Sequence, residues 1–147
     1  MGKSAAIRCM DSRLNGSLGD KLKEMGLDAS DMISLAGSSL AVAQGSIWLP
    51  WRWPLWATKM IMIYHLRLAV RLHGVKTVVV VHHSNCGAYA SRYSFSSLRE
   101  EKNIQCKDMR RTRRVLLKKF PDLEVMLVWA ELQEEEGIVT ATFSIIE

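Results

Sequence analysis

Four consecutive valines at residues 78–81 constrain the fold more than any other stretch of the sequence. β-Branched side chains favour extended backbone, and an apolar run without polar alternation is typical of a strand buried on both faces. The run completes a predicted strand over 75–81, and the sequence HHSNC at 82–86 follows at once. The chain therefore carries reactive side chains at the point where a central strand ends.

The segments around this strand alternate between strand and helix patterns. We predict strands over 5–9, 32–35, 75–81, 123–130 and 138–146, and helices over 18–25, 59–72 and 108–120. Such alternation predicts an α/β fold with a mostly parallel central sheet flanked by helices. The polar turn at 134–137 predicts that the C-terminal strand pairs antiparallel with the strand before it. Ligands of such sheets bind at the carboxyl ends of the strands.

Length and composition fit one globular domain over residues 1–147. The chain is 48% hydrophobic and 24% charged, which excludes a disordered chain. The longest apolar run, residues 60–70, is too short for a membrane span and contains His65 and Arg67. Three cysteines without a secretory signal favour the cytoplasm, where thiols stay reduced.

Two predicted strands end in residues that bind metals. Cys9 ends the first strand, and His83 and Cys86 follow the valine strand. Neighbouring strands lie about 4.8 Å apart, so these three side chains would converge if the two strands are adjacent. Two thiolates and an imidazole suit zinc, and three protein ligands leave a fourth position for water, as in catalytic zinc sites. The alternative is that both cysteines are small apolar core residues.

Asp11 and Arg13 follow Cys9 at intervals of two residues. Asp11 is close enough to hydrogen-bond a metal-bound water or to take the open position itself. Arg13 could pair with Asp11 and hold it off the metal, because a nearby cation favours the ionised carboxylate. The alternative is a purely structural ion pair at a strand end.

The sequence CMDSR at 9–13, followed by HSNCGA at 83–88, resembles the signature of the β-class carbonic anhydrases. The stretches 34–37 (SLAG) and 68–88 are similar to further parts of that family. The resemblance implies a zinc enzyme that hydrates carbon dioxide to bicarbonate with a metal-bound hydroxide. The implied zinc ligands are Cys9, His83 and Cys86, and the implied catalytic dyad is Asp11 and Arg13.

The resemblance also implies an assembly and a substrate site. It places Gly37, Ser38 and Gly87 beside the substrate, names carbon dioxide or bicarbonate as the small-molecule partner, and implies a homodimer or a larger homo-oligomer. The sequence departs from the family in lacking its N-terminal helical arm before Cys9. It also has Ser38 where the family has asparagine, and His82 where it has glycine.

These departures keep two other functions open. One is hydrolysis of a carbon dioxide analogue, carbonyl sulfide or carbon disulfide, on the same scaffold. The other is a zinc-binding, non-catalytic relative that acts as an interaction module. We interpret His82 as a bystander, with proton shuttling as the alternative because imidazole titrates near neutral pH.

The segment 47–56 (IWLPWRWPLW) combines four tryptophans with two prolines, which we expect to exclude a regular helix. It could form a membrane anchor, a subunit interface, a wall of the substrate pocket or part of the core. An interface or a core role is favoured, because the segment lacks the amphipathic helical pattern and lysine-rich flank of a membrane anchor.

Residues 107–119 (KDMRRTRRVLLKK) are strongly basic. A nucleic-acid surface is one interpretation, but no nucleic-acid-binding motif accompanies the charges. We favour a solvated helix face whose apolar residues, Met109, Val115, Leu116 and Phe120, pack inward. Nucleic acid is therefore not an expected partner, and Cys106 just before this stretch is expected to be a free thiol.

Overall fold

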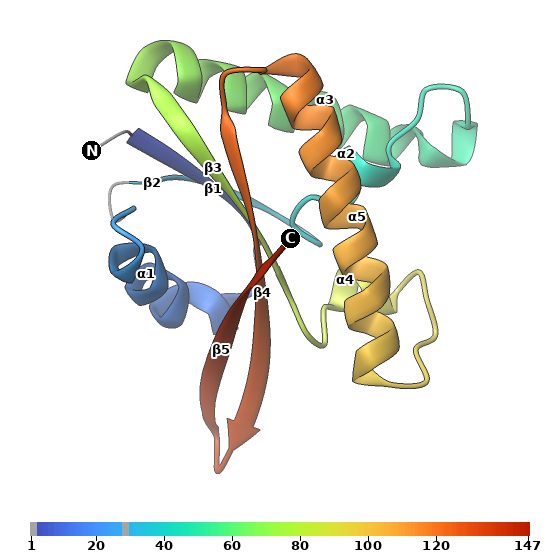
Figure 1. Ribbon diagram of the computed structural model, residues 1–147. Helices are drawn as coiled ribbons and strands as arrows, with labels where there is room; N and C mark the ends of the chain where they lie inside the picture. Colours follow the sequence, from blue (N-terminus) through green and yellow to red (C-terminus); the bar gives the residue numbers. More distant parts are fainter. Residues whose placement is uncertain (1–2, 28–29) are drawn as a thin grey trace.

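The computed structural model describes residues 3–27 and 30–147, and its centre is a five-stranded sheet of order β2-β1-β3-β4-β5 (Figure 1). The strands are β1 (Lys3–Cys9), β2 (Ser30–Leu35), β3 (Val75–His83), β4 (Glu124–Glu135) and β5 (Ile138–Ile146). β1 pairs parallel with β2 and β3, and β3 pairs parallel with β4. β4 and β5 pair antiparallel, so the predicted fold class is confirmed.

Helices cover both faces of this sheet (Figure 1). They are α1 (Asn15–Glu24), α2 (Leu40–Gln44), α3 (Trp53–Leu68), α4 (Gly87–Ala90) and α5 (Leu98–Lys119), with short 3₁₀ segments η1 (Ser12–Leu14) and η2 (Pro50–Arg52) and a π-helical segment η3 (Ala69–His73). One core layer contains residues of α1, and the other contains residues of α3 and α5. The sheet therefore separates two hydrophobic cores.

β3 lies between these two cores. Val78 and Val80 belong to the core under α3 and α5, whereas Val79 and Val81 belong to the core under α1. All four valines are fully buried. The apolar run therefore reflects burial on both faces, as predicted.

The start of α3 corrects one prediction. The helix begins at Trp53, within the tryptophan-rich segment, rather than at residue 59. Pro54 stands in its first turn, where a missing backbone N–H costs no intrahelical hydrogen bond. The expectation that the prolines exclude a regular helix from residues 47–56 is thus wrong for the second half of that segment.

α5 is also longer than predicted, since it begins at Leu98 rather than at residue 108. The Ser97 side chain caps the helix by accepting a hydrogen bond from the Glu100 N–H. Serine followed three residues later by glutamate is a helix-start signature, which marks this start in the sequence. β4 likewise extends to Glu135, so the turn shortens to Glu136 and Gly137, both at positive φ.

Candidate metal centre

The three predicted ligands lie together at the carboxyl edge of the sheet. β1 and β3 are neighbours, so Cys9 at the end of β1 meets His83 at the end of β3 and Cys86 in the following loop. The two sulfurs are 4.0 Å apart, and the ligand atoms of all three residues lie within 4.8 Å of one another. A tetrahedral zinc ion with Zn–S bonds of about 2.3 Å needs its sulfurs about 3.8 Å apart. The donor set therefore fits an ion of this size.

The imidazole of His83 is oriented for metal binding. Its Nδ1 lies 2.8 Å from the Ser84 carbonyl oxygen, so Nδ1–H donates and Nε2 keeps its lone pair. Nε2 is buried and has no hydrogen-bond partner among the described residues. A buried polar atom without a partner is costly, and a bound cation would satisfy it. A backbone carbonyl behind a metal-binding histidine is a common way of fixing its tautomer.

The two thiols influence each other because their sulfurs are in contact. The hydrogen bond from the Cys86 thiol lowers the pKa of Cys9 to about 3. The same contact raises the pKa of Cys86, and burial raises it further. The contact thus favours one thiolate and one thiol in the pair. A cation between the sulfurs would favour the second thiolate, because metal binding and thiol deprotonation are coupled.

Asp11 and Arg13 form the predicted pair at the rim of this cluster. The Arg13 guanidinium donates to both carboxylate oxygens over 2.7 to 3.2 Å, and the Arg13 backbone N–H donates to Oδ1. The hydrogen bond from Arg13 lowers the pKa of Asp11 to about 2. Asp11 Oδ2 lies 3.8 Å from His83 Nε2. The carboxylate is thus ionised at neutral pH, close to the ligand atoms and held by Arg13.

The three residues predicted to adjoin the substrate differ in where they lie. The Gly37 N–H contacts the Cys9 sulfur, and Gly37 has φ +73°, which favours glycine. Gly87 opens α4 directly after Cys86. The Ser38 hydroxyl is buried and donates to the Ile7 carbonyl oxygen over 3.2 Å. Both glycines therefore adjoin a ligand, whereas the Ser38 hydroxyl faces the backbone of β1.

His82 is buried beside the site, and its ring lies in a separate hydrogen-bond network. Nδ1 lies 2.9 Å from Gln105 Oε1, and Nε2 lies 2.8 Å from Ser39 Oγ. Burial lowers the pKa of His82 to about 4, so the ring is neutral near pH 7. Both ring nitrogens are engaged away from the three-residue cluster, which agrees with the interpretation of His82 as a bystander.

Arg8 braces the Cys9 side of the site, and sequence reasoning missed it. The side chain is buried, with Nε donating to the Cys9 carbonyl oxygen over 2.8 Å and Nη2 to the Asp11 carbonyl oxygen over 2.7 Å. An arginine inside an otherwise apolar strand was the available signal, because buried charge is rare without partners. The guanidinium fixes the backbone between ligand and dyad.

Glu101 and Gln105 of α5 were also missed, because the predicted helix began after them. Glu101 accepts hydrogen bonds from the backbone N–H groups of Asn85 and Cys86 over 2.9 and 3.0 Å. Gln105 Nε2 donates to the His83 carbonyl oxygen over 3.0 Å. α5 therefore holds the loop that carries two of the three ligands.

A model of the family described as "Putative carbonic anhydrase" matches residues 2–140 of the chain. The chain belongs to this carbonic anhydrase family. An uncharacterized protein of Rickettsia bellii is 28% identical over 123 residues, covering 81% of this chain and 70% of the relative. An uncharacterized protein of Rickettsia conorii is 26% identical over 143 residues, covering 95% of this chain and 71% of the relative.

Solved β-carbonic anhydrases share the fold of this family member. The enzyme CafA of Aspergillus fumigatus superposes with a TM-score of 0.57 at 15% identity, covering 96% of this chain and 75% of that chain. One of two tetrameric β-carbonic anhydrases of Sordaria macrospora gives a TM-score of 0.57 at 16% identity, covering 97% and 82%. The family match and the shared fold agree with the resemblance seen in the sequence.

Proposed function

We propose that this chain is a zinc-dependent carbonic anhydrase, which hydrates carbon dioxide reversibly to bicarbonate. The observation that carries the proposal is the buried convergence of Cys9, His83 and Cys86, with the free Nε2 of His83 facing the cluster. Membership of a carbonic anhydrase family and the β-carbonic anhydrase fold support it.

The ligands, Asp11 and Arg13 have different roles in the proposed reaction. Cys9, His83 and Cys86 would hold the ion, whose chemistry there would be to lower the pKa of a water molecule to about 7. Asp11 accepts a hydrogen bond from the reacting water and orients it. With a pKa of about 2, Asp11 remains a carboxylate near neutral pH and so acts as an acceptor rather than as a proton donor. Arg13 holds the carboxylate in that orientation.

A stopped-flow carbon dioxide hydration assay tests the proposal. We expect activity from the wild type and a loss of about 100-fold in Asp11→Asn, because an amide no longer offers two acceptor oxygens. The variant should keep one zinc per chain. Asp20→Asn is the matched control, since Asp20 is an exposed aspartate on α1 outside the ligand cluster. Its activity should equal that of the wild type.

The same assay separates the alternatives. Wild-type protein that holds one zinc per chain but shows no hydration between pH 7 and 9 contradicts the proposal. Carbonyl sulfide offered in parallel then distinguishes a hydrolase of that analogue from a non-catalytic zinc protein.

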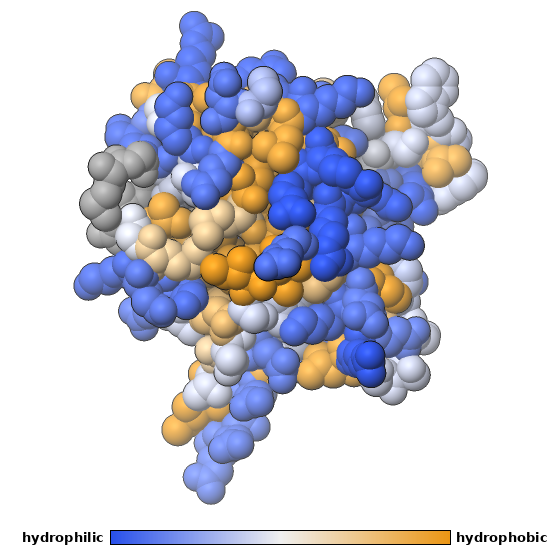
Figure 2. All heavy atoms as spheres, in the orientation of Figure 1, coloured by the Kyte–Doolittle hydropathy of each residue, from blue (hydrophilic) through white to orange (hydrophobic). Residues whose placement is uncertain are grey.

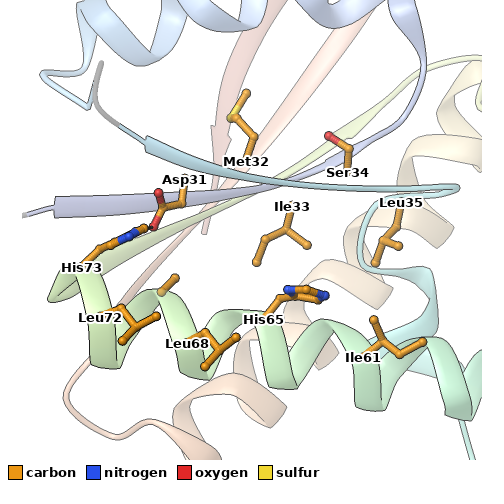
Figure 3. Close-up of a pocket in the computed structure, with 11 residues that line it drawn as sticks. Asp31, Met32, Ile33, Ser34, Leu35, Ile61, His65, Leu68, Leu72 and His73 are labelled. Atoms are coloured by element: carbon orange, nitrogen blue, oxygen red, sulfur yellow. Dashed lines mark hydrogen bonds and ion pairs between the residues drawn. The ribbon is translucent and has the colours of Figure 1, made fainter.

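We further propose that the enzyme is a homo-oligomer that associates through the groove between β2 and α3. The groove has a volume of about 500 Å³ and continues along η3 (Figure 3). In Figure 3 the side chains of Ile33 and Leu35 point from β2 toward the helix, where Ile61 and Leu68 line the other wall. β2 is an edge strand, so its outer backbone groups are unpaired within the described sheet.

A second copy of the chain is the occupant that this edge favours. A two-fold axis would place the β2 edge and the α3 face of one copy against the same surfaces of the other. The unpaired backbone groups would then find hydrogen-bond partners, and the apolar side chains would be buried. The apolar surface continues along Ile61 and Leu72, which are 54% and 66% exposed. The tetrameric state of the Sordaria macrospora enzymes supports the association of more than one copy.

The tryptophan-rich segment 47–56 is a second exposed apolar region, which leads into α3 and projects from the body as the cyan segment of Figure 1. Trp48, Trp51 and Trp53 are 89%, 73% and 54% exposed, so the core interpretation is wrong for these three side chains. No helix among the described residues is long and apolar enough to span a membrane. Exposed tryptophans beside an arginine are typical of the centre of a protein interface.

The basic stretch of α5 forms a different, hydrophilic surface (Figure 2). Lys107, Arg110 and Arg114 are exposed there, whereas Met109 and Leu116 are buried. This agrees with a solvated helix face whose apolar residues pack inward.

A further inference from the structure

The end of β3 and the loop after it, which together carry His83 and Cys86, are held by α5. Glu101 Oε2 accepts from the Asn85 N–H over 2.9 Å, and Oε1 accepts from the Cys86 N–H over 3.0 Å. Gln105, one turn further along α5, donates to the His83 carbonyl oxygen over 3.0 Å. Glu101 and Gln105 are 4% and 0% exposed, so solvent does not compete for these bonds.

We infer that Glu101 and Gln105 are positioning residues that hold the backbone of residues 83–86 in the shape in which both of its ligands face one ion. The inference deepens the proposed function and rests on the metal centre proposed there. Neither side chain belongs to the ligand cluster. Both act through backbone groups of the ligands, the N–H of Cys86 and the carbonyl of His83.

This loop needs external support because its backbone is not in a favoured conformation. Asn85 has φ +53°, in the left-handed region, which asparagine tolerates better than most side chains but which is less populated than the right-handed and extended regions. Its N–H bonds Glu101, and its carbonyl oxygen accepts from Arg13 over 3.0 Å. The conformation is therefore fixed on one side by α5 and on the other by the arginine of the dyad.

A carboxylate is required at position 101 by the directions of the hydrogen bonds. Oε1 accepts from the Cys86 N–H and from Gln105 Nε2, and Oε2 accepts from the Asn85 N–H. Three donors thus converge on two oxygens that must both be acceptors. An amide offers one acceptor oxygen and places an NH₂ group against the remaining N–H.

The hydrogen-bond donors and acceptors around Gln105 also fix the orientation of its side-chain amide. Its Nε2 donates to the His83 carbonyl and to Glu101, so its Oε1 must accept from His82 Nδ1–H. His82 Nε2 then carries no proton and accepts from the Ser39 hydroxyl. The donors and acceptors are ordered in one direction from Ser39 through His82 and Gln105 to the His83 carbonyl oxygen. Reversing the Gln105 amide would break these contacts.

The test compares Glu101→Gln with Glu100→Gln. Both substitutions remove one carboxylate from the first turn of α5, but the Glu100 carboxylate accepts from the backbone N–H and hydroxyl of Ser96, away from the metal loop. Zinc affinity is measured by competition with a chelator, and amide hydrogen exchange at Asn85 and Cys86 is measured in the metal-free protein. We expect Glu101→Gln to bind zinc about 10- to 100-fold more weakly and to exchange both amides faster. Glu100→Gln should match the wild type in both.

Equal zinc affinity of Glu101→Gln and the wild type would overturn the inference, as would unchanged exchange at both amides. If the wild type itself binds no zinc, the proposed function fails, and the exchange rates alone decide whether Glu101 positions the loop. If Glu101→Gln does not fold, Gln105→Met replaces it in both measurements, because it removes the donor to His83 and keeps the side-chain volume. The NMR signature of His82 with its proton on Nδ1 is an independent readout that Gln105→Met should change.

Discussion

Two edges of the sheet differ in which side chains they bury. The carboxyl edge of β1 and β3 buries polar side chains, whereas the outer edge of β2 exposes apolar ones. At the first edge, the polar side chains of Arg8, Glu101 and Gln105 are at most 5% exposed and are hydrogen-bonded. At the second, Met32 and Leu72 are 48% and 66% exposed. Buried polar groups are costly unless they are paired, so the first pattern indicates a built site. Large exposed apolar surface marks a missing partner, so the second indicates an interface.

The largest expected effect is the loss of zinc when a ligand at the first edge is replaced. Cys86→Ser should lower zinc content from one ion per chain to nearly none and abolish hydration, because serine supplies no thiolate. The control is Cys106→Ser, since Cys106 is an equally buried free cysteine that lies outside the ligand cluster. Metal analysis of purified protein is the measurement. Full zinc content in Cys86→Ser would show that Cys86 is not a zinc ligand.

The second effect concerns stability at the first edge. Arg8→Met removes the guanidinium donors to the carbonyl oxygens of Cys9 and Asp11, and of these two the Asp11 carbonyl keeps a second donor, the Leu14 N–H. The loss of the donor to the buried Cys9 carbonyl costs about 1–3 kcal/mol, so the free energy of unfolding should fall by about 2 kcal/mol in chemical denaturation. Arg99→Met, at an exposed position of α5, should change it by less than about 0.5 kcal/mol. Equal stability of the two variants would show that Arg8 does not brace the loop.

The ligand set could be predicted from the sequence because it depends on short spacings at strand ends. Cys9 and the pair His83 and Cys86 each follow a recognisable strand, and strand adjacency then brings them together. The supporting residues could not be predicted in the same way. Glu101 lies 15 residues from Cys86 in the chain, and its contact depends on how α5 packs against the sheet.

The tryptophan-rich segment shows a second limit. Two prolines predicted a break, yet Pro54 occupies the first turn of α3, where proline is tolerated. Apolar composition favoured an interface or a core equally, because composition does not show which side of a segment faces the protein. Only the fold shows that Trp48 and Trp51 face solvent in the single chain.

The third effect concerns the second edge. The double variant Trp51→Ala with Trp53→Ala should weaken self-association at least 10-fold in sedimentation, because exposed tryptophans at an interface centre contribute most of its binding energy. Ile145→Ala is the control, since Ile145 is 61% exposed on β5 at the opposite sheet edge. Zinc content should be unchanged in the double tryptophan variant and in Ile145→Ala. An unchanged oligomer would show that the interface does not include this segment.

The smallest expected effect compares two aspartate pairs, one at each edge. Asp31 and His73 approach to 2.6 Å, closer than Asp11 and Arg13 at 2.7 Å, but their side chains are 36% and 53% exposed. Exposed pairs contribute about 0–1 kcal/mol, since solvent screens them, and this one also requires a protonated His73. Asp31→Asn should therefore change the free energy of unfolding by less than about 0.5 kcal/mol at pH 7.

A larger loss would mean that this end of the groove is shielded from water, as it would be if a second copy covered it in solution. Repeating the measurement in the dissociated Trp51→Ala with Trp53→Ala background distinguishes shielding by a partner from an effect within one chain, because only the former disappears there.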